Sequence, residues 1–298
     1  MAYFLQQIAN AVPVAALYAA LAFGYAIAFA VTRRADLTYG ALFAFAGQIF
    51  VLFADFGWNR LWLVLPAALG VGAVAALTFG LGAGLVAGRY VMRPLAFSSA
   101  NAVVVASLGS LLLLMETARL ASDTRSLWLP PFLNEVIVFW PDPRFPVTLT
   151  AVQLVNTGLM MALVAGGHWL LTHSYAGRYW RAVSEDREAA ALCGVDPSAV
   201  YIVAYGAAAL IATVCGILAA SYYGNMDFGM GLSFGVKVLF IAAIGGQTAP
   251  LLAACGAAGV GLLETLWSAY GPILWRDFAI FGFLVVVLVV TRREKAIP

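Results

Sequence analysis

The sequence predicts an all-α fold: a polytopic transmembrane helical bundle of eight or nine membrane segments that forms one domain over residues 1–298. Two features of the composition predict it: 63% of the 298 residues are hydrophobic, and only 10% are charged. Soluble domains are roughly 45–50% apolar and about 25% charged, so a soluble fold could not bury this much apolar surface. A lipid bilayer solvates apolar side chains and removes that constraint.

The third observation is a series of long uncharged runs. A helix needs about 20 apolar residues to cross a hydrocarbon core about 30 Å thick. Runs that meet or approach this length are 11–32, 37–54, 61–88, 94–115, 145–173, 197–226 and 238–263. A last span, about 272–291, carries Arg276 and Asp277 near one end. These runs predict at least eight segments.

The interval 233–267 decides between eight and nine segments. It forms either one long helix or two passes that turn at Gly245-Gly246-Gln247-Thr248-Ala249-Pro250, a sequence that breaks helices. Short cytoplasmic loops are enriched in Lys and Arg. Two passes place the more basic connections in the cytoplasm, with the N-terminus outside and the C-terminus inside. This pattern favours nine passes, with eight as the alternative.

Several function classes are excluded by what the chain lacks. The net charge is +2 without a basic cluster, so no nucleic-acid partner is expected. The cysteines form no CxxC pair, and the two histidines are too few for a metal site. The chain has no Gly-rich phosphate loop and no hydrolase motif. We therefore expect neither an enzyme nor a bound cofactor, and the driving energy should come from another subunit.

A long connection, about 120–146, is expected on the external side of the membrane. It is rich in tryptophan and proline, at Trp128, Pro130, Pro131, Trp140, Pro141, Pro143 and Pro146. One interpretation is a loop whose aromatic side chains lie at headgroup depth. The other is a docking surface for a soluble partner outside the membrane.

A second connection, about 174–197, is the most charged part of the chain and is expected in the cytoplasm. The stretch 180–192 contains no Gly or Pro and predicts one short helix. Gly194 is expected to end that helix, and Pro197 prevents its continuation. The three alanines at 189–191 predict a low-relief patch on its surface.

The motif Glu188-Ala189-Ala190, followed by Gly194, resembles the coupling loop of the membrane subunits of ABC importers. Small alanines permit close approach of another subunit, and glycine allows the chain to turn back. The alternative is an ordinary loop helix whose alanines reflect an alanine-rich chain.

Further motifs resemble the LIV family of permeases, the branched-chain amino acid class of ABC importers. They cover nearly the whole chain: Ala22-Phe23-Gly24-Tyr25 with Asp36-Leu37-Thr38-Tyr39-Gly40-Ala41, Arg93-Pro94-Leu95, Gly177-Arg178, Arg181-Ala182, Lys237 with the Gly245-Gly246 hairpin, Glu264 and Asp277. The chain departs from the family where an Asn-Phe-Ala-His-Gly sequence is replaced by residues 36–40, so any role of that histidine is absent.

The resemblance implies a division of labour. The chain would pair with a second, related permease in the bacterial inner membrane. Two cytoplasmic ATPases would carry ATP and Mg²⁺, and a periplasmic binding protein would deliver the solute. The residues that would couple to the ATPases are Arg181, Glu185, Glu188, Ala189, Ala190 and Gly194. The expected solute is a branched-chain or other amino acid, and the alternatives are urea, a short amide or a small organic acid.

Ionisable side chains inside the membrane are costly and are functional candidates by default. Here they are Lys237, Glu116 and Glu264. Each also has a plain interpretation: Lys237 could snorkel to the interface, Glu116 could pair with Arg119 one turn away, and Glu264 could mark the end of a span. The same two glutamates are the carboxylates that a stand-alone secondary transporter would need.

Four uncharged polar residues complete the candidates for a solute path: Gln48, Asn101, Ser107 and Ser110. Polar residues in membrane helices also hold helices together by hydrogen bonds. The sequence alone does not separate these two roles.

Overall fold

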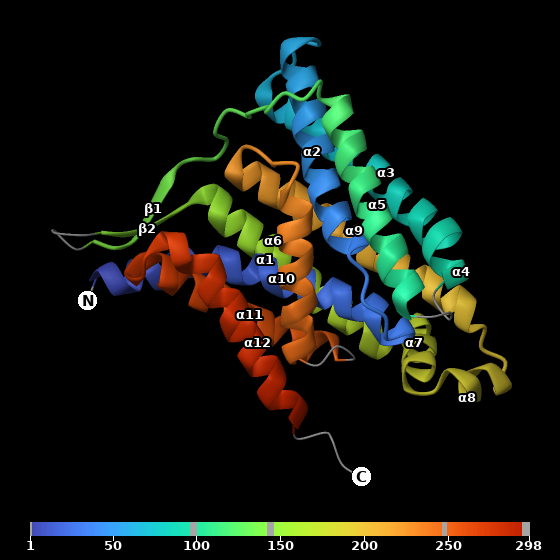
Figure 1. The fold of residues 1–298 in the computed structure, drawn as a ribbon. Helices are drawn as coiled ribbons and strands as arrows, with labels where there is room; N and C mark the ends of the chain where they lie inside the picture. Colours follow the sequence, from blue (N-terminus) through green and yellow to red (C-terminus); the bar gives the residue numbers. More distant parts are fainter. Residues whose placement is uncertain (1, 96–99, 142–145, 246–248, 294–298) are drawn as a thin grey trace.

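The bundle is built from long apolar helices that run between two ends of the molecule (Figure 1). The computed structural model describes residues 2–95, 100–141, 146–245 and 249–293. The long helices are α1 (Ala2–Thr32), α2 (Thr38–Asn59), α3 (Leu65–Val86), α5 (Ala100–Ala121), α6 (Ala151–His173), α9 (Pro197–Tyr223), α10 (Met230–Gly245), α11 (Pro250–Tyr270) and α12 (Arg276–Arg293).

Shorter elements connect these helices. They are the π-helix η1 (Ala87–Met92), α4 (Arg93–Leu95), α7 (Tyr175–Glu185), α8 (Arg187–Leu192), the 3₁₀-helix η2 (Ile273–Trp275), and strands β1 (Val136–Trp140) and β2 (Val147–Thr150). The fold class is therefore as the composition predicts, with one small sheet in the part of the chain that the structure describes.

Eight helices among the described residues are long and apolar enough to cross a membrane, and α10 is a shorter ninth apolar helix. The interval 233–267 breaks between Gly245 and Pro250, as the two-pass alternative predicts; Gly246 itself lies outside the described residues. At about 1.5 Å per residue, the 16 residues of α10 extend about 24 Å, less than the hydrocarbon core.

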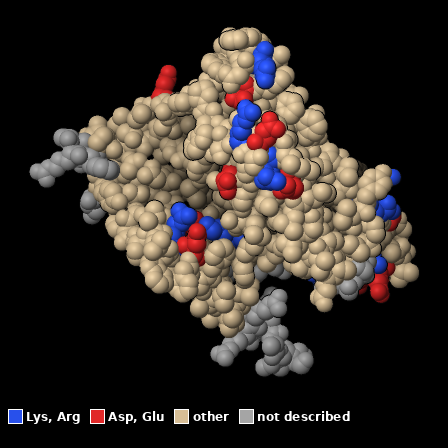
Figure 2. All heavy atoms as spheres, turned by 45° about the horizontal axis from the view of Figure 1, so that its top comes forward, with Lys and Arg blue, Asp and Glu red and all other residues tan. Residues whose placement is uncertain are grey.

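The centre of the bundle consists of α1, α2 and α9, the spans with the largest buried fraction. Helix α1 packs against α11, α9 and α6, and α2 packs against α3, α9 and α10. The outer helices keep apolar faces exposed, as lipid-facing helices do. The face drawn in Figure 2 is accordingly mostly uncharged, and its charged side chains gather in a few groups.

The two central helices α2 and α9 approach closely because both carry glycines at their contact. A Cβ atom at Gly216 of α9 would lie 2.2 Å from the carbonyl oxygen of Phe43 and 3.1 Å from the backbone nitrogen of Gly47, both on α2. Small residues allow this backbone approach in membrane bundles. By contrast, a Cβ atom at Gly82 of α3 would meet nothing within 4 Å.

A hairpin of β1 and β2 stands at the end of the bundle where α1 begins (Figure 1). The Gln6 side chain of α1 accepts a hydrogen bond from the Thr148 backbone N–H at 2.7 Å and donates one to the Thr148 carbonyl at 2.8 Å. The long connection expected over about 120–146 contains strand β1, and the expectation of a span from 145 is wrong. Val147, Thr148 and Thr150 are β-branched and favour a strand, so the helix begins only at Ala151.

We expect Gly216→Ala to lower the stability of the folded chain, because the added methyl group would collide with backbone atoms of α2. Overpacking of this kind costs about 1–3 kcal/mol. The measurement is the thermal unfolding midpoint of the purified protein in mild detergent. Gly82→Ala is the matched control and should leave the midpoint unchanged or slightly raised. Equal midpoints for the two variants would contradict the close α2–α9 contact.

Candidate functional site

The 174–197 segment, the expected coupling loop, folds into two helices joined at Asp186. The expectation of one helix over 180–192 is wrong, because Asp186 adopts an extended conformation and caps α8. Its Oδ1 accepts hydrogen bonds from the backbone N–H groups of Glu188 at 2.9 Å and Ala189 at 3.0 Å. Aspartate is a favoured N-cap residue, since it satisfies donors that the first turn leaves free.

The chain leaves α8 through a glycine turn, as predicted. Gly194 has a φ of +86°, a conformation that glycine adopts without steric cost. The backbone N–H of Val195 donates to the carbonyl of Ala190 at 3.1 Å. Asp196 then caps α9, and Pro197 opens that helix. The segment is thus a defined structure with two capped helices.

The alanines of α8 do not form one surface patch. Ala190 is only 5% exposed and packs into the core of the bundle, so its expected place on the surface is wrong. Ala189 and Ala191 are exposed, and the neighbouring Leu192 is 90% exposed. The outward side of α8 therefore includes two small alanines and one protruding apolar side chain.

The first of these two helices, α7, is bonded directly to the end of α1. The indole N–H of Trp180 donates to the Ile27 carbonyl at 2.9 Å in a buried position. The guanidinium of Arg33 donates to the Ser184 carbonyl at 3.0 Å. Arg181, by contrast, bonds locally to the carbonyl oxygens of Gly177 and Thr172. Glu185 and Glu188 are exposed and line a groove between α1 and α8.

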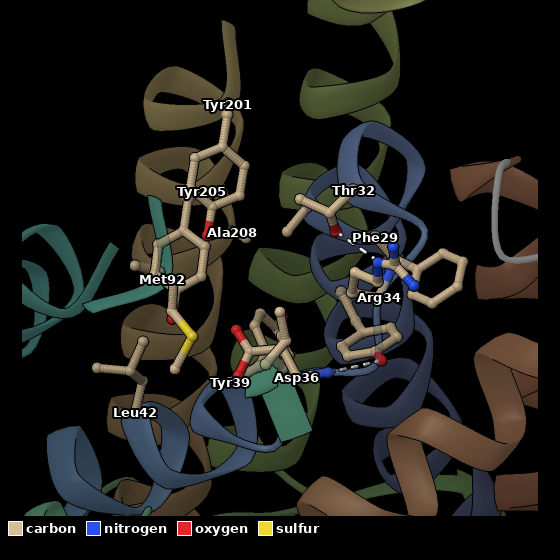
Figure 3. Close-up of a pocket in the computed structure, with 14 residues that line it drawn as sticks. Phe29, Thr32, Arg34, Asp36, Tyr39, Leu42, Met92, Tyr201, Tyr205 and Ala208 are labelled. Carbon is tan, nitrogen blue, oxygen red and sulfur yellow. Dashed lines mark hydrogen bonds between the residues drawn. The ribbon is translucent and has the colours of Figure 1, made fainter. Parts of the chain in front are cut away.

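The connection between α1 and α2 holds a second polar feature, Asp36, at a position where the chain departs from the family motif. Its Oδ1 accepts a hydrogen bond from the Thr38 N–H at 2.8 Å, which supports the start of α2. The carboxylate lies beside a small cavity lined by tyrosines, with Tyr39 and Tyr205 among them (Figure 3). Burial raises the pKa of Asp36. The cavity, about 20 Å³, has room for a water molecule and not for a solute.

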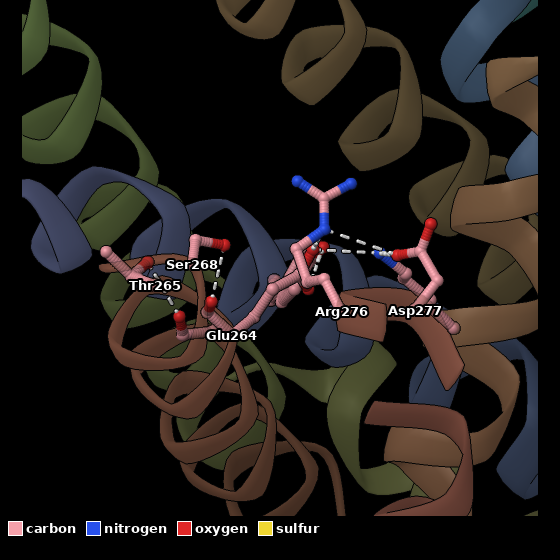
Figure 4. A network of polar contacts seen from close by, with 8 residues as sticks. Glu264, Thr265, Ser268, Arg276 and Asp277 are labelled. Atoms are coloured by element: carbon pink, nitrogen blue, oxygen red, sulfur yellow. Dashed lines mark hydrogen bonds and ion pairs between the residues drawn. The ribbon is translucent and has the colours of Figure 1, made fainter. Parts of the chain in front are cut away.

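Four charged residues from three helices meet in the bundle: Lys237 of α10, Glu264 of α11, and Arg276 and Asp277 of α12. Figure 4 shows the last three of them side by side. We call these four residues the charged cluster. Lys237 Nζ lies 2.9 Å from Glu264 Oε1 and 3.2 Å from Asp277 Oδ1. Arg276 Nε lies 3.7 Å from the same Glu264 oxygen and 3.4 Å from the same Asp277 oxygen.

Helix α1 also contributes to this site. The hydroxyl of Tyr18 donates to Glu264 Oε2 at 2.7 Å, so both oxygens of that carboxylate are engaged. Lys237 and Glu264 are only 7% and 8% exposed. Two opposite charges in so apolar a place stabilise each other, whereas either alone would be costly. The expectations that Lys237 snorkels to the interface and that Glu264 only marks a span end are both wrong.

The other polar candidates do not join the charged cluster. Glu116 forms the expected ion pair with Arg119, one turn away on α5, and both side chains are exposed. Asn101 is exposed on the same helix. Gln48 is buried on α2, and its side-chain nitrogen has no hydrogen-bond partner among the described residues. Gly245 ends α10 and contributes the helix break described above.

Sequence reasoning did not single out Tyr18 or Arg276 as site residues. An aromatic residue within an apolar helix is common in membrane proteins, and an arginine at a helix start is commonly an interfacial anchor. No local pattern distinguishes these two from such residues. The only available signal was the need for a partner, since buried Lys237 and Glu264 each required an opposite charge or a hydrogen bond.

We expect Lys237→Met and Glu264→Gln each to destabilise the protein, because each removes the nearest opposite charge of a buried partner. Breaking a buried pair costs about 3–5 kcal/mol. The double variant should lose less than the sum of the two single losses, since it leaves neither partner of the pair charged. Thermal unfolding of the four proteins measures this difference. Glu116→Gln, on the exposed ion pair, is the control and should change little. Strictly additive losses would show that the pair is not coupled.

Comparison with known proteins agrees with the geometry. Residues 7–289 match the family of the branched-chain amino acid transport system permease component. The permease protein LivH of the high-affinity branched-chain amino acid transport system of Escherichia coli K12 is 27% identical over 296 residues, covering 97% of this chain and 94% of that protein. LivH of Salmonella typhimurium is 26% identical with the same coverage.

A more distant relative is the permease protein BraD of the corresponding system of Pseudomonas aeruginosa. It is 23% identical over 290 residues, covering 96% of this chain and 93% of that protein. No solved structure matches the chain. The family match and the long apolar helices confirm the resemblance and the multi-pass location in the bacterial inner membrane. The chain belongs to the family of permease components of branched-chain amino acid transport systems.

Proposed function

We propose that this chain is the membrane-spanning permease subunit of an ABC importer for a small amino acid, with branched-chain amino acids as the first substrates to test. ATP and Mg²⁺ would bind to two partner ATPases, a second related permease would complete the membrane part, and a binding protein would deliver the solute. The observation that carries this proposal is the 174–197 segment, which presents α8 at the periphery of the molecule (Figure 1).

The surface of α8 suits docking into a groove on another protein. Leu192 protrudes, and Ala189 and Ala191 beside it leave room for a close approach. The helix is held in place by the Asp186 cap and by Ala190, which packs into the bundle. A rigid, pre-formed surface binds without the entropic cost of ordering a flexible loop.

The alternative that the chain works alone as a secondary transporter is disfavoured by the surroundings of Glu116 and Glu264, the two carboxylates that could bind a coupling ion. Such a carrier needs a carboxylate that can bind and release a coupling ion within the membrane. Glu116 is exposed and paired with Arg119. Glu264 is paired with Lys237 and hydrogen-bonded to Tyr18. Neither carboxylate is available, whereas the exposed surface of α8 has no role in that mechanism.

The attachment of α7 to α1 offers a route from the ATPases to the inside of the bundle. A displacement of α8 would move α7, and through Trp180 and Arg33 it would move the end of α1. The same helix carries Tyr18, which contacts the charged cluster through Glu264. We infer that α1 transmits the conformational change between the two ends of the molecule.

We expect Leu192→Glu to abolish co-purification of the ATPases and solute uptake, because it places a charge in an apolar contact. Anchors of this kind contribute 2 kcal/mol or more to binding, which corresponds to roughly 30-fold in affinity. Affinity purification in mild detergent with mass spectrometry of the partners measures the effect. Leu133→Glu, the same change in the external connection, should leave ATPase recovery unchanged. Normal ATPase recovery with Leu192→Glu would contradict docking on α8.

A second variant tests the attachment of α7 to α1. Trp180→Phe keeps an aromatic ring and removes the N–H that bonds the Ile27 carbonyl. A hydrogen bond contributes about 1 kcal/mol, so we expect the ATP hydrolysed per solute transported to rise about fivefold, with the ATPases still bound. Reconstituted vesicles measure both rates. Trp169→Phe, on the exposed face of α6, is the control. An unchanged ratio would show that this bond does not transmit the motion.

A further inference from the structure

Not every hydrogen-bond donor of the charged cluster has a partner within it. Donors without a partner belong to Arg276. The Nε atom of Arg276 faces the carboxylates of Glu264 and Asp277. Both Nη atoms point away from these carboxylates (Figure 4), and neither has a hydrogen-bond partner in the part of the chain that the structure describes. A guanidinium carries five N–H donors in a planar fork. The Nε–H of Arg276 makes only the two ion-pair contacts and no hydrogen bond, and the four N–H groups on the Nη atoms remain open.

Asp277 is open on the same side. Its Oδ1 is engaged by Lys237 and Arg276, while its other carboxylate oxygen points the same way as the free Nη atoms of Arg276 (Figure 4). The side chains of Arg276 and Asp277 are 38% and 57% exposed, in contrast to Lys237 and Glu264 at 9% and 10%. The cluster therefore has a buried half, Lys237 and Glu264, which pair with each other, and an accessible half that presents one cation and one anion.

The accessible half lies toward the end of the molecule opposite α7 and α8. Helix α11 ends beside the start of α1, where the rings of Tyr3 and Tyr270 are in contact with centroids 5.7 Å apart. Arg276 and Asp277 follow Tyr270 by a few residues. On the face shown in Figure 2, basic and acidic side chains are grouped at the edge of a hollow.

This arrangement is complementary to a zwitterion. In an α-amino acid, one carbon atom joins a carboxylate to an ammonium group, so the two charges are adjacent, as they are in Arg276 and Asp277. Guanidinium forks bind carboxylates through two parallel N–H···O bonds. The buried half supports this geometry, because Lys237 and Glu264 fix the inner atoms of both side chains.

We propose that Arg276 and Asp277 form a binding site for the α-carboxylate and α-ammonium groups of an amino acid at the opening of the translocation path. The proposal rests on the proposed function, since it names the part of the solute that the permease itself recognises. Arg276 and Asp277 would bind only the two charged groups common to all α-amino acids, so other residues or the binding protein would discriminate between solute side chains. Lys237, Glu264 and Tyr18 act as positioning residues that hold the pair in place.

The first test is chemical protection of Arg276, which requires neither transport nor partner subunits. The purified protein is treated with phenylglyoxal, and peptides are analysed by mass spectrometry. We expect millimolar L-leucine to slow the modification of Arg276 and 3-methylbutylamine, which lacks the carboxylate, to leave it unchanged. Arg125, an exposed arginine outside the cluster, serves as the internal control because any consumption of the reagent would slow its modification too.

Two variants complete the test. Asp277→Asn removes the partner of the ammonium group, and the L-leucine concentration needed for protection should rise about tenfold. Arg276→Lys keeps a cation but cannot form the two parallel bonds. In vesicles holding the whole transporter, it should raise KM for L-leucine uptake about tenfold, with the amount of bound ATPase unchanged. Arg125→Lys is the matched control and should leave KM unchanged.

Each outcome bears on the proposal. Protection of Arg276 by L-leucine alone, together with the rise in KM, supports the site. Equal protection by both compounds, or by neither, overturns it, even if the transporter is active. A loss of uptake with Arg276→Lys that is accompanied by a lower unfolding midpoint and no change in KM would show a structural role only. Absence of ATPases and of uptake in the unmodified protein would instead overturn the proposed function.

Discussion

A charge inside a membrane bundle must find a partner, and helices α10, α11 and α12 are arranged around the pair that Lys237 and Glu264 form. Their side chains come from α10 and α11, and the pair is completed by Tyr18 of α1 and by Asp277 of α12. Lipid supplies no hydrophobic driving force between helices, so polar contacts and close packing determine which helices associate. The charged cluster therefore fixes α10, α11 and α12 against the central helix.

Helix α1 connects the two parts of the molecule on which the proposed function depends. At one end it meets the hairpin through Gln6, in its middle it reaches the charged cluster through Tyr18, and at its other end it is bonded to α7 through Ile27 and Arg33. Because one helix contacts both parts of the molecule, a change in its position would affect both of them. ATP-driven movement of α8 and release of a solute would share this element.

Much of this architecture could be predicted from the sequence. The apolar runs predicted the helices, the helix-breaking sequence from Gly245 to Pro250 predicted the break between α10 and α11, and Gly194 predicted the end of α8. Errors arose where a local residue overrode a broad pattern. Asp186 divided one expected helix by capping the next, and the β-branched residues near Val147 turned the start of an expected span into a strand.

The sequence by itself determined the membrane location, the helical class and the family, because composition, periodicity and motif spacing are properties of residues that lie close together in the chain. Only the tertiary structure decided that Ala190 faces inward while Leu192 faces outward, and that Lys237 and Glu264, 27 residues apart, form one ion pair. Packing decides such facts, since the side of a helix that is buried depends on which other helices surround it. The tertiary structure likewise decided that Arg276 and Asp277 lie side by side with part of each side chain exposed.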